Sequence, residues 1–147
     1  MKAILISIKP KWVAKILNGE KTIEIRKTMP KCDLPIDVYI YCTKSNYLGF
    51  ISNRYIGKVV AKFTLDKVEE IKAKYIGFAY YYTPNLETLG IMMSSCLEKK
   101  ELFEYLKYDK GYAWHISNLV IFDKPKELSE FGVKCSPQSY QYIEIGE

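Results

Sequence analysis

The chain passes from a predicted helix into a predicted strand within residues 18–27, which read Asn-Gly-Glu-Lys-Thr-Ile-Glu-Ile-Arg-Lys. Gly19 favours the left-handed backbone conformation that ends a helix, and the alternation that follows it is typical of a strand. Lys21, Glu24 and Arg26 bring an ammonium, a carboxylate and a guanidinium into this junction. We therefore expect a helix-to-strand turn that carries a cluster of charges.

Arg26 stands out because the chain has twenty lysines and only one other arginine, Arg54. A guanidinium is planar, permanently charged and able to bind phosphate or carboxylate through two parallel hydrogen bonds. Two interpretations of the junction stay open, namely an exposed strand face with a surface ion pair, and a ligand site. On an ideal strand Lys21 points away from Glu24 and Arg26. It can join them only if the backbone is still turning after Gly19.

The bulk composition predicts one domain that spans residues 1–147. Apolar residues make up 48% of the chain, which is enough for a core without disulfides, and the net charge of +5 is compatible with an anionic partner such as nucleic acid. The four cysteines match no zinc spacing and no C-x-x-C motif. No signal sequence and no membrane-spanning apolar run is present. We therefore expect a cytoplasmic protein with free thiols and with no metal, cofactor or membrane partner.

Hydrophobic periodicity predicts about six strands, at residues 2–8, from about 22 onward, 37–43, 57–68, 112–122 and 139–145. It predicts helices at residues 10–18 and 97–106, and a short one at 86–93. Residues 69–83 fit either a helix or an extended segment, and the aromatic stretch Phe78–Tyr82 fits either a stacking surface or a flap over the core. The strands do not alternate with crossover helices. We therefore expect an α+β fold, a small mixed β-barrel with a short N-terminal helix and one or two further helices.

The residues show no phosphate loop, no Ser-His-Asp elbow and no metal cluster. The only histidine, His115, lies in an apolar strand and is best interpreted as a structural residue. Lys21 would act as a base or nucleophile only if desolvation lowered its pKa, and a nearby carboxylate opposes that. Lys21 beside Glu24 therefore indicates an ion pair or an anion contact.

Three segments carry recognisable motifs. Residues 19–26 read Gly-x-Lys-x-x-Glu-x-Arg and follow Ser-Ile-Lys-Pro-Lys-Trp at residues 7–12. Residues 114–119 read Trp-His-Ile-Ser-Asn-Leu, with Lys-Pro at 124–125, and residues 137–142 read Pro-Gln-Ser-x-x-Tyr. Together they resemble the ASCH domain family, relatives of the PUA RNA-binding domain, in its phage and prophage type. The resemblance spans most of the chain, although residues 44–55 and 72–110 match no motif of the family.

The resemblance implies a PUA-like barrel and a basic cleft beside the first helix, where RNA or a nucleotide-like ligand would bind. Lys21, Glu24 and Arg26 match the family motif directly. One branch of the family hydrolyses the amide of acetylated cytidine, and ribonuclease activity is described for another. The amidohydrolase branch has a threonine where this chain has Glu24, so its mechanism does not transfer. Its third catalytic residue, a glutamate, has no clear counterpart, since Glu69 and Glu70 only lie in the corresponding region.

Three functions remain as hypotheses. In a binding module for RNA, DNA or a free nucleotide, Lys9, Lys11, Lys21 and Arg26 would neutralise phosphate, and Glu24 would orient Arg26 or accept a base N–H. Bases would stack on Trp12, Trp114 or a tyrosine of the segment Tyr80–Tyr82. In a hydrolase, Lys21 and Glu24 would form the catalytic acid–base pair. In the third hypothesis the tyrosine-rich surface binds a protein partner.

Overall fold

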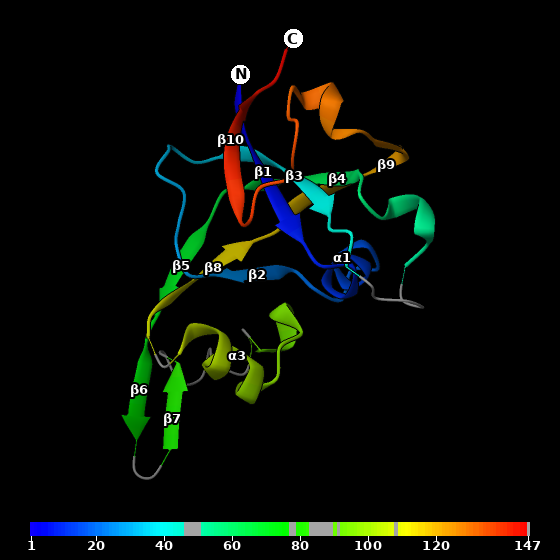
Figure 1. Cartoon of the computed structure of the whole chain (residues 1–147). Helices are drawn as coiled ribbons and strands as arrows, with labels where there is room; N and C mark the ends of the chain where they lie inside the picture. The colour runs from blue at the N-terminus through cyan, green and yellow to red at the C-terminus, as the bar shows by residue number, and fades with distance from the viewer. Residues whose placement is uncertain (46–50, 77–78, 83–89, 91, 108, 147) are drawn as a thin grey trace.

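The computed structural model describes residues 1–45, 51–76, 79–82, 90, 92–107 and 109–146. Within them the strands form a five-stranded sheet, a three-stranded sheet and a two-stranded hairpin (Figure 1). The N- and C-terminal ends lie side by side, and the Met1 amino group donates a hydrogen bond to the Ile145 carbonyl at 3.0 Å.

The five-stranded sheet has the order β10-β1-β3-β4-β9. Its strands are β10 (Tyr140–Glu144), β1 (Lys2–Ile8), β3 (Ile36–Cys42), β4 (Val59–Leu65) and β9 (Ser117–Lys126). Only the β1–β3 pair is parallel. From Ala3 to Ile8 every residue of β1 is buried, because both faces of the sheet are covered.

Helix α1 (Pro10–Leu17) connects β1 to the opposite sheet and sets up the motif at residues 18–27. Pro10 occupies a first helical position, where its missing N–H breaks no helical hydrogen bond. Val13 and Ile16 are buried in the core. Gly19 has a φ of +86°, in the left-handed region that ends helices, and the chain then enters β2 (Ile23–Arg26).

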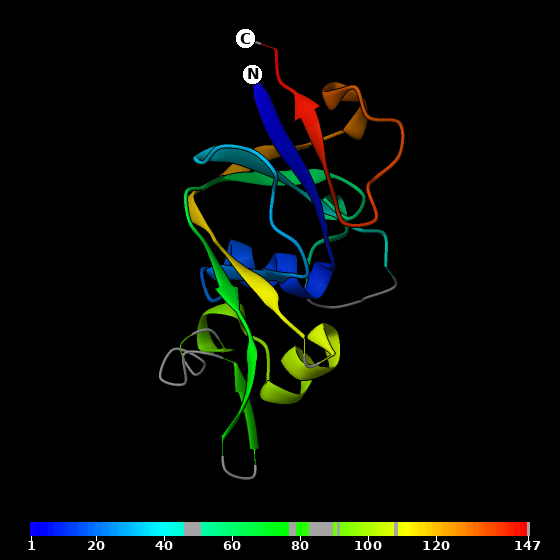
Figure 2. The same cartoon turned by 90° about the vertical axis from the view of Figure 1, so that its left-hand side faces the viewer.

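The three-stranded sheet has the order β2-β8-β5, where β8 is Gly111–His115 and β5 is Val68–Ile71. One face packs against the five-stranded sheet around Trp114, which is fully buried. The other face carries Ile23 and Ile25 and is covered by α3 (Lys99–Leu106) through Leu102, Phe103 and Leu106. In both Figure 1 and Figure 2, α3 and the β6–β7 hairpin lie beyond this sheet, away from the five-stranded one.

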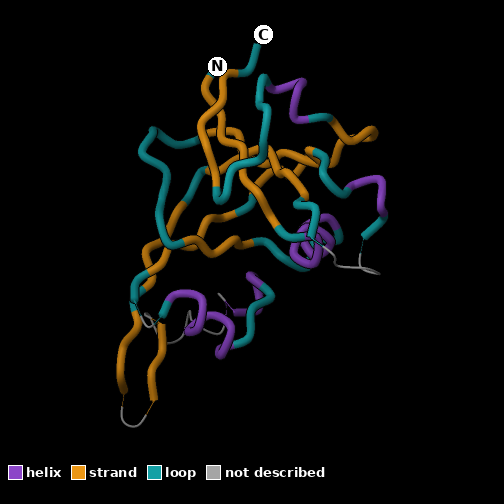
Figure 3. Tube along the Cα trace, viewed as in Figure 1, coloured by secondary structure: helices purple, strands orange, loops and turns teal. Residues whose placement is uncertain are grey.

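Two short 3₁₀ turns complete the described structure. The first, η1 (Asn53–Tyr55), precedes β4, and the second, η2 (Leu128–Phe131), packs with Leu128 and Phe131 on the outer face of the five-stranded sheet. Figure 3 shows the strands at the centre of the molecule and α3 outside them.

The structure confirms an α+β fold of mixed sheets with a few helices, but the described strands form no closed barrel. The expected strand at residues 112–122 is two strands, β8 and β9, which belong to different sheets. The expected strand at 57–68 contains β4, and only its last residue, Val68, belongs to β5. Strands that bend from one sheet into another keep one apolar pattern throughout. The described chain contains ten strands where the sequence predicted about six, because residues 112–122 form two strands and three more lie within residues 68–82, almost all of which the sequence left open.

The middle of the chain is extended where the sequence left the choice open. After β5 come β6 (Ala73–Ile76) and β7 (Ala79–Tyr82), which pair antiparallel. Phe78 lies outside the described residues, as do the side chains of Ala79–Tyr82. Of the short helix expected at 86–93, residues 86–89 and 91 lie outside the described residues, residues 90, 92 and 93 are helical, and the helix continues to residue 95.

None of the helices in the described part of the chain has the length and apolar character needed to cross a membrane. All four cysteines are free. Burial raises the pKa of the Cys42 thiol to about 11, so this side chain is an unreactive core residue at neutral pH.

Candidate functional site

A cleft of about 900 Å³ opens where α1, β2 and α3 meet the segment before β10. Its lining contains four basic and two acidic side chains, namely Lys9, Lys21, Arg26, Lys27, Glu24 and Glu101. The remaining lining residues are Ser7, Ile8, Trp12, Ile25, Thr28, Thr43, Ser45, Leu97, Tyr105, Ser136, Pro137, Gln138 and Ser139. The residues predicted from the 18–27 motif therefore lie in a cleft with excess positive charge.

Lys21 reaches Glu24 because the backbone is still turning when it leaves α1. The Lys21 N–H donates to the Lys15 carbonyl at 3.0 Å, and the strand begins only at Ile23. The Lys21 side chain is 1% exposed, and its Nζ lies 3.3 Å from Glu24 Oε1. Nζ also donates to the Ser95 carbonyl at 2.6 Å, which fixes the ammonium between two acceptors.

Glu24 is held between two cations. Its Oε2 accepts a hydrogen bond from Arg26 Nη2 at 2.8 Å, opposite the contact with Lys21. The same Nη2 donates to the Ser7 carbonyl at 2.8 Å, and Nη1 donates to Ser139 Oγ at 3.2 Å. The Glu24 and Arg26 side chains are 8% and 12% exposed. This is a buried ion cluster, so the interpretation as an exposed strand face with a surface ion pair is wrong.

The neighbouring cations keep Glu24 ionised. Burial alone raises the pKa of this carboxyl, but the charges of Lys21 and Arg26 and their hydrogen bonds outweigh burial, and the pKa lies below its ordinary value. The pKa of Tyr105 is raised by burial, with Glu24 adding to the rise and Arg26 opposing it. The tyrosine side chain therefore lies within electrostatic reach of the ion cluster.

Two buried polar atoms in this cleft have no hydrogen-bond partner among the described residues, Arg26 Nε and Thr43 Oγ1. Leaving such a group unpaired costs about 1–3 kcal/mol. The Arg26 Nε–H requires an acceptor, and the Thr43 hydroxyl can donate or accept. Both atoms are covered in this structure, so a ligand with acceptor oxygens would reach them only after neighbouring side chains move.

The other predicted binding residues divide into two groups. Lys9 and Trp12 line the cleft. Lys11 is not among its lining residues, and its Nζ lies 4.6 Å from the centroid of the Trp12 ring. Trp114 is 0% exposed and donates from Nε1 to the Thr28 carbonyl at 3.1 Å, so the structure gives it a packing role in the core instead of a free stacking face.

The sequence missed Ser95, Thr43 and Tyr105. Ser95 and Tyr105 come from the stretch that matched no family motif, and only their position in the folded chain places them beside β2. Thr43 follows β3, which lies parallel to β1, so the topology brings it beside Ile8. No pattern within the sequence marks these three residues.

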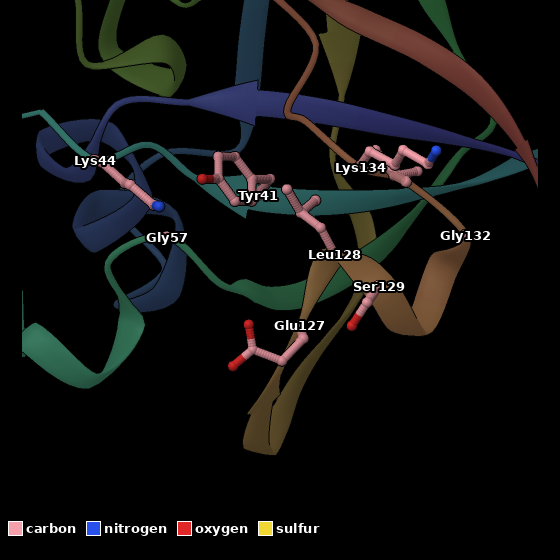
Figure 4. Close-up of a pocket in the computed structure, with 9 residues that line it drawn as sticks. Tyr41, Lys44, Gly57, Glu127, Leu128, Ser129, Gly132 and Lys134 are labelled. Atoms are coloured by element: carbon pink, nitrogen blue, oxygen red, sulfur yellow. The ribbon is translucent and has the colours of Figure 1, made fainter.

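A second hollow of about 540 Å³ lies over the outer side of the five-stranded sheet (Figure 4). It is lined by Tyr41, Lys44, Gly57, Glu127, Leu128, Ser129, Gly132, Val133 and Lys134. Its carboxylate, Glu127, pairs with Lys58, and these side chains are 57% and 33% exposed. Among the described residues, neither hollow contains three His, Cys, Asp or Glu side chains that could hold a metal ion.

These observations define a small α+β domain with a basic cleft that contains a buried ion cluster. The ASCH domain model matches residues 6–126, and the chain belongs to the ASCH domain family. The crystal structure of the ASCH protein from Zymomonas mobilis is similar, with a TM-score of 0.70, 17% identity, and coverage of 97% of this chain and 87% of that one.

The crystal structures of two variants of that protein are similar to this chain to the same degree. Its Tyr-to-Phe variant has a TM-score of 0.70 at 17% identity and covers 98% of this chain and 91% of its own. Its Ser-to-Ala variant has a TM-score of 0.70 at 16% identity, with 97% and 88% covered. At these identities the likeness shows the fold alone. No curated protein matches the chain.

Proposed function

We propose that this chain binds single-stranded RNA or a nucleotide in the cleft around Arg26. The observation that carries the proposal is the unpaired Arg26 Nε, buried in a cleft that also holds the unpaired Thr43 hydroxyl and has more basic than acidic side chains. Phosphate oxygens are the acceptors that a guanidinium binds best. Lys9 and Lys27 add positive charge at the same cleft.

Nucleotide binding uses the ion cluster as a rigid support. Lys21 and Glu24 are fully engaged with each other, with Ser95 and with Arg26, so they hold the guanidinium in one orientation. A guanidinium fixed in advance loses little entropy when a ligand binds. In this proposal Lys21 and Glu24 position Arg26, and the phosphate contacts come from Arg26 and the cleft lysines.

The alternative is a hydrolase in which Lys21 and Glu24 transfer protons to RNA or to an acylated cytidine. The two groups do meet in the cleft, 3.3 Å apart. However, Glu24 has a lowered pKa and two cationic partners, which makes it a poor proton donor at neutral pH. This electrostatic arrangement favours binding as the main function.

We further propose that the protein acts in the cytoplasm and belongs to the phage and prophage type, whose motifs at residues 114–119 and 137–142 it carries.

The test measures the affinity for a labelled single-stranded RNA of about eight nucleotides at several salt concentrations. We expect affinity to fall as salt rises, because bound counterions are released from phosphate. Arg26→Lys keeps the charge but removes the guanidinium fork, and we expect it to weaken binding by about tenfold.

The matched control is Arg54→Lys, which changes the only other arginine. Arg54 is exposed and donates to the Asp123 carbonyl at 3.0 Å, and it does not line the cleft. The control should bind RNA as the wild type does. Absence of binding by the wild type at low salt, or equal losses in the two variants, would overturn the proposal. Turnover of the RNA that disappears in Lys21→Met would instead favour the hydrolase.

A further inference from the structure

Helix α3 supplies a wall of the cleft that faces the ion cluster. Glu101 and Tyr105 line the cleft from one side of α3, because they are four residues apart, and Leu97 lines it from just before the helix. Leu102, Phe103 and Leu106 lie on the buried side and pack against β2 and β8. The apolar packing of α3 thereby fixes the distance between Tyr105 and the strand that carries Arg26.

Among the described residues, two aromatic rings line the cleft, and their surroundings differ. Trp12 already has two ammonium groups against its ring, Lys11 Nζ at 4.6 Å and Lys21 Nζ at 5.2 Å from the centroid. Tyr105 has Lys27 Nζ at 5.0 Å from its centroid and is 39% exposed, although it is a large apolar ring. Lys27 is itself exposed, so its ammonium, which lies over the Tyr105 ring, can move aside.

Tyr105 also lies close to the anion-binding side of the cleft. The charges of Glu24 and Arg26 both act on its hydroxyl, while burial holds the hydroxyl in its neutral form. The ring thus stands near a guanidinium that has a free N–H, and near a lysine that can contact either a phosphate or a ring face. A partly exposed aromatic ring next to phosphate-binding groups is the arrangement that single-stranded nucleic acid binding uses.

We infer that Tyr105 is the stacking platform for one unpaired base, which takes the place of the Lys27 ammonium over the ring. The inference rests on the proposed function and names the part of the ligand that the ion cluster does not reach. The ligand then has two features, a phosphate or other acceptor at Arg26 and a planar ring at Tyr105. The cleft volume of about 900 Å³ is large enough for both.

Base stacking is separated from phosphate binding by comparing two ligands. One is a short single-stranded RNA, and the other is an abasic oligonucleotide of the same length with the same number of phosphates. We expect the wild type to bind the RNA about tenfold more tightly than the abasic strand, in line with the usual strength of base–aromatic stacking. Tyr105→Leu should remove this preference and leave the affinity for the abasic strand unchanged, which also shows that the variant is folded. Tyr105→Phe should keep the preference, because the ring remains.

Tyr142→Leu is the matched control. Tyr142 is 38% exposed and has Lys2 Nζ at 4.2 Å from its ring centroid, but it lies on β10 and does not line the cleft. This variant should keep the wild-type preference for RNA. The inference is overturned if Tyr105→Leu keeps that preference, if Tyr105→Phe loses it, if Tyr142→Leu loses it, or if the wild type binds both ligands equally. Failure of the wild type to bind either ligand at low salt overturns the proposed function itself.

Discussion

A lysine–glutamate pair lies in the cleft, and another lies beside the second hollow, but the two pairs are buried to different extents. In the cleft, the Lys21 and Glu24 side chains are 1% and 8% exposed. Beside the second hollow, the Lys58 and Glu127 side chains are 33% and 57% exposed. The first pair has lost its water and depends on protein groups to replace it, whereas the second pair remains hydrated.

This difference in burial distinguishes an ion cluster supported by several parts of the chain from an ion pair at the surface. Around Glu24 the chain supplies Lys21 and Arg26, and these two cations are held in turn by three distant segments, through the Ser95 carbonyl, the Ser7 carbonyl and the Ser139 hydroxyl. Such a cluster fixes the position of a charged group at a considerable desolvation cost. Around Glu127 the partners are Lys58 and the local backbone of η2, where the carboxylate belongs to a helix-capping arrangement. The Lys58–Glu127 pair therefore has a structural explanation that needs no ligand.

The largest predicted effect is on stability and comes from the buried pair. Glu24→Gln leaves Lys21 and Arg26 without their carboxylate, and removing one partner of a buried pair typically costs about 3–5 kcal/mol. Lys58→Gln removes a solvated pair and should cost less than about 1 kcal/mol. Urea titration of both variants and the wild type measures the free energy of unfolding. Equal losses in the two variants would mean that burial does not distinguish the pairs.

Lowering the pH should reduce the difference in unfolding free energy between the wild type and Glu24→Gln, because acid protonates Glu24 in the wild type. The folded pKa of Glu24 lies below its ordinary value of 4.5. A carboxyl with a lowered folded pKa stabilises the protein above its unfolded pKa, and this stabilisation is lost as the pH falls through the folded pKa. We expect the gap in unfolding free energy between wild type and Glu24→Gln to be constant near neutral pH and to shrink below about pH 4.5. A gap that stays constant to lower pH would show that the carboxylate charge is not the stabilising feature.

The local parts of the fold were predictable from the sequence. The first strand, the first helix and its stop at Gly19 follow from apolar spacing and backbone preference within about twenty residues, and the structure has them at Lys2–Ile8, Pro10–Leu17 and a φ of +86°. The division of residues 112–122 between two sheets was not predictable. The apolar pattern continues across Ile116, and only the pairing of its N–H with the Thr22 carbonyl marks the corner.

The site was predictable to the extent that one segment contains it. Lys21, Glu24 and Arg26 lie within six residues, and their residue types indicate charge recognition. Their burial was not predictable, because it depends on Ser95 and Ser139, which are distant in sequence. Trp114 illustrates the same limit. It pairs with Glu24 across two strands, yet its side chain lies in the core, and alternation alone does not say which face of a sheet is covered.

The smallest predicted effect concerns the unpaired Thr43 hydroxyl. It compares the cleft with the second hollow through RNA affinity, not through stability. Thr43→Val removes a buried hydroxyl that has no partner among the described residues, so stability should be unchanged or rise by up to about 1 kcal/mol. If the ligand in the cleft bonds this hydroxyl, RNA affinity should fall by a few fold, the usual value of one neutral hydrogen bond. Ser129→Ala in the second hollow is the control and should leave RNA affinity unchanged. An unaltered affinity in Thr43→Val would mean that the bound RNA does not use this hydroxyl and would confine recognition to the Arg26 side of the cleft.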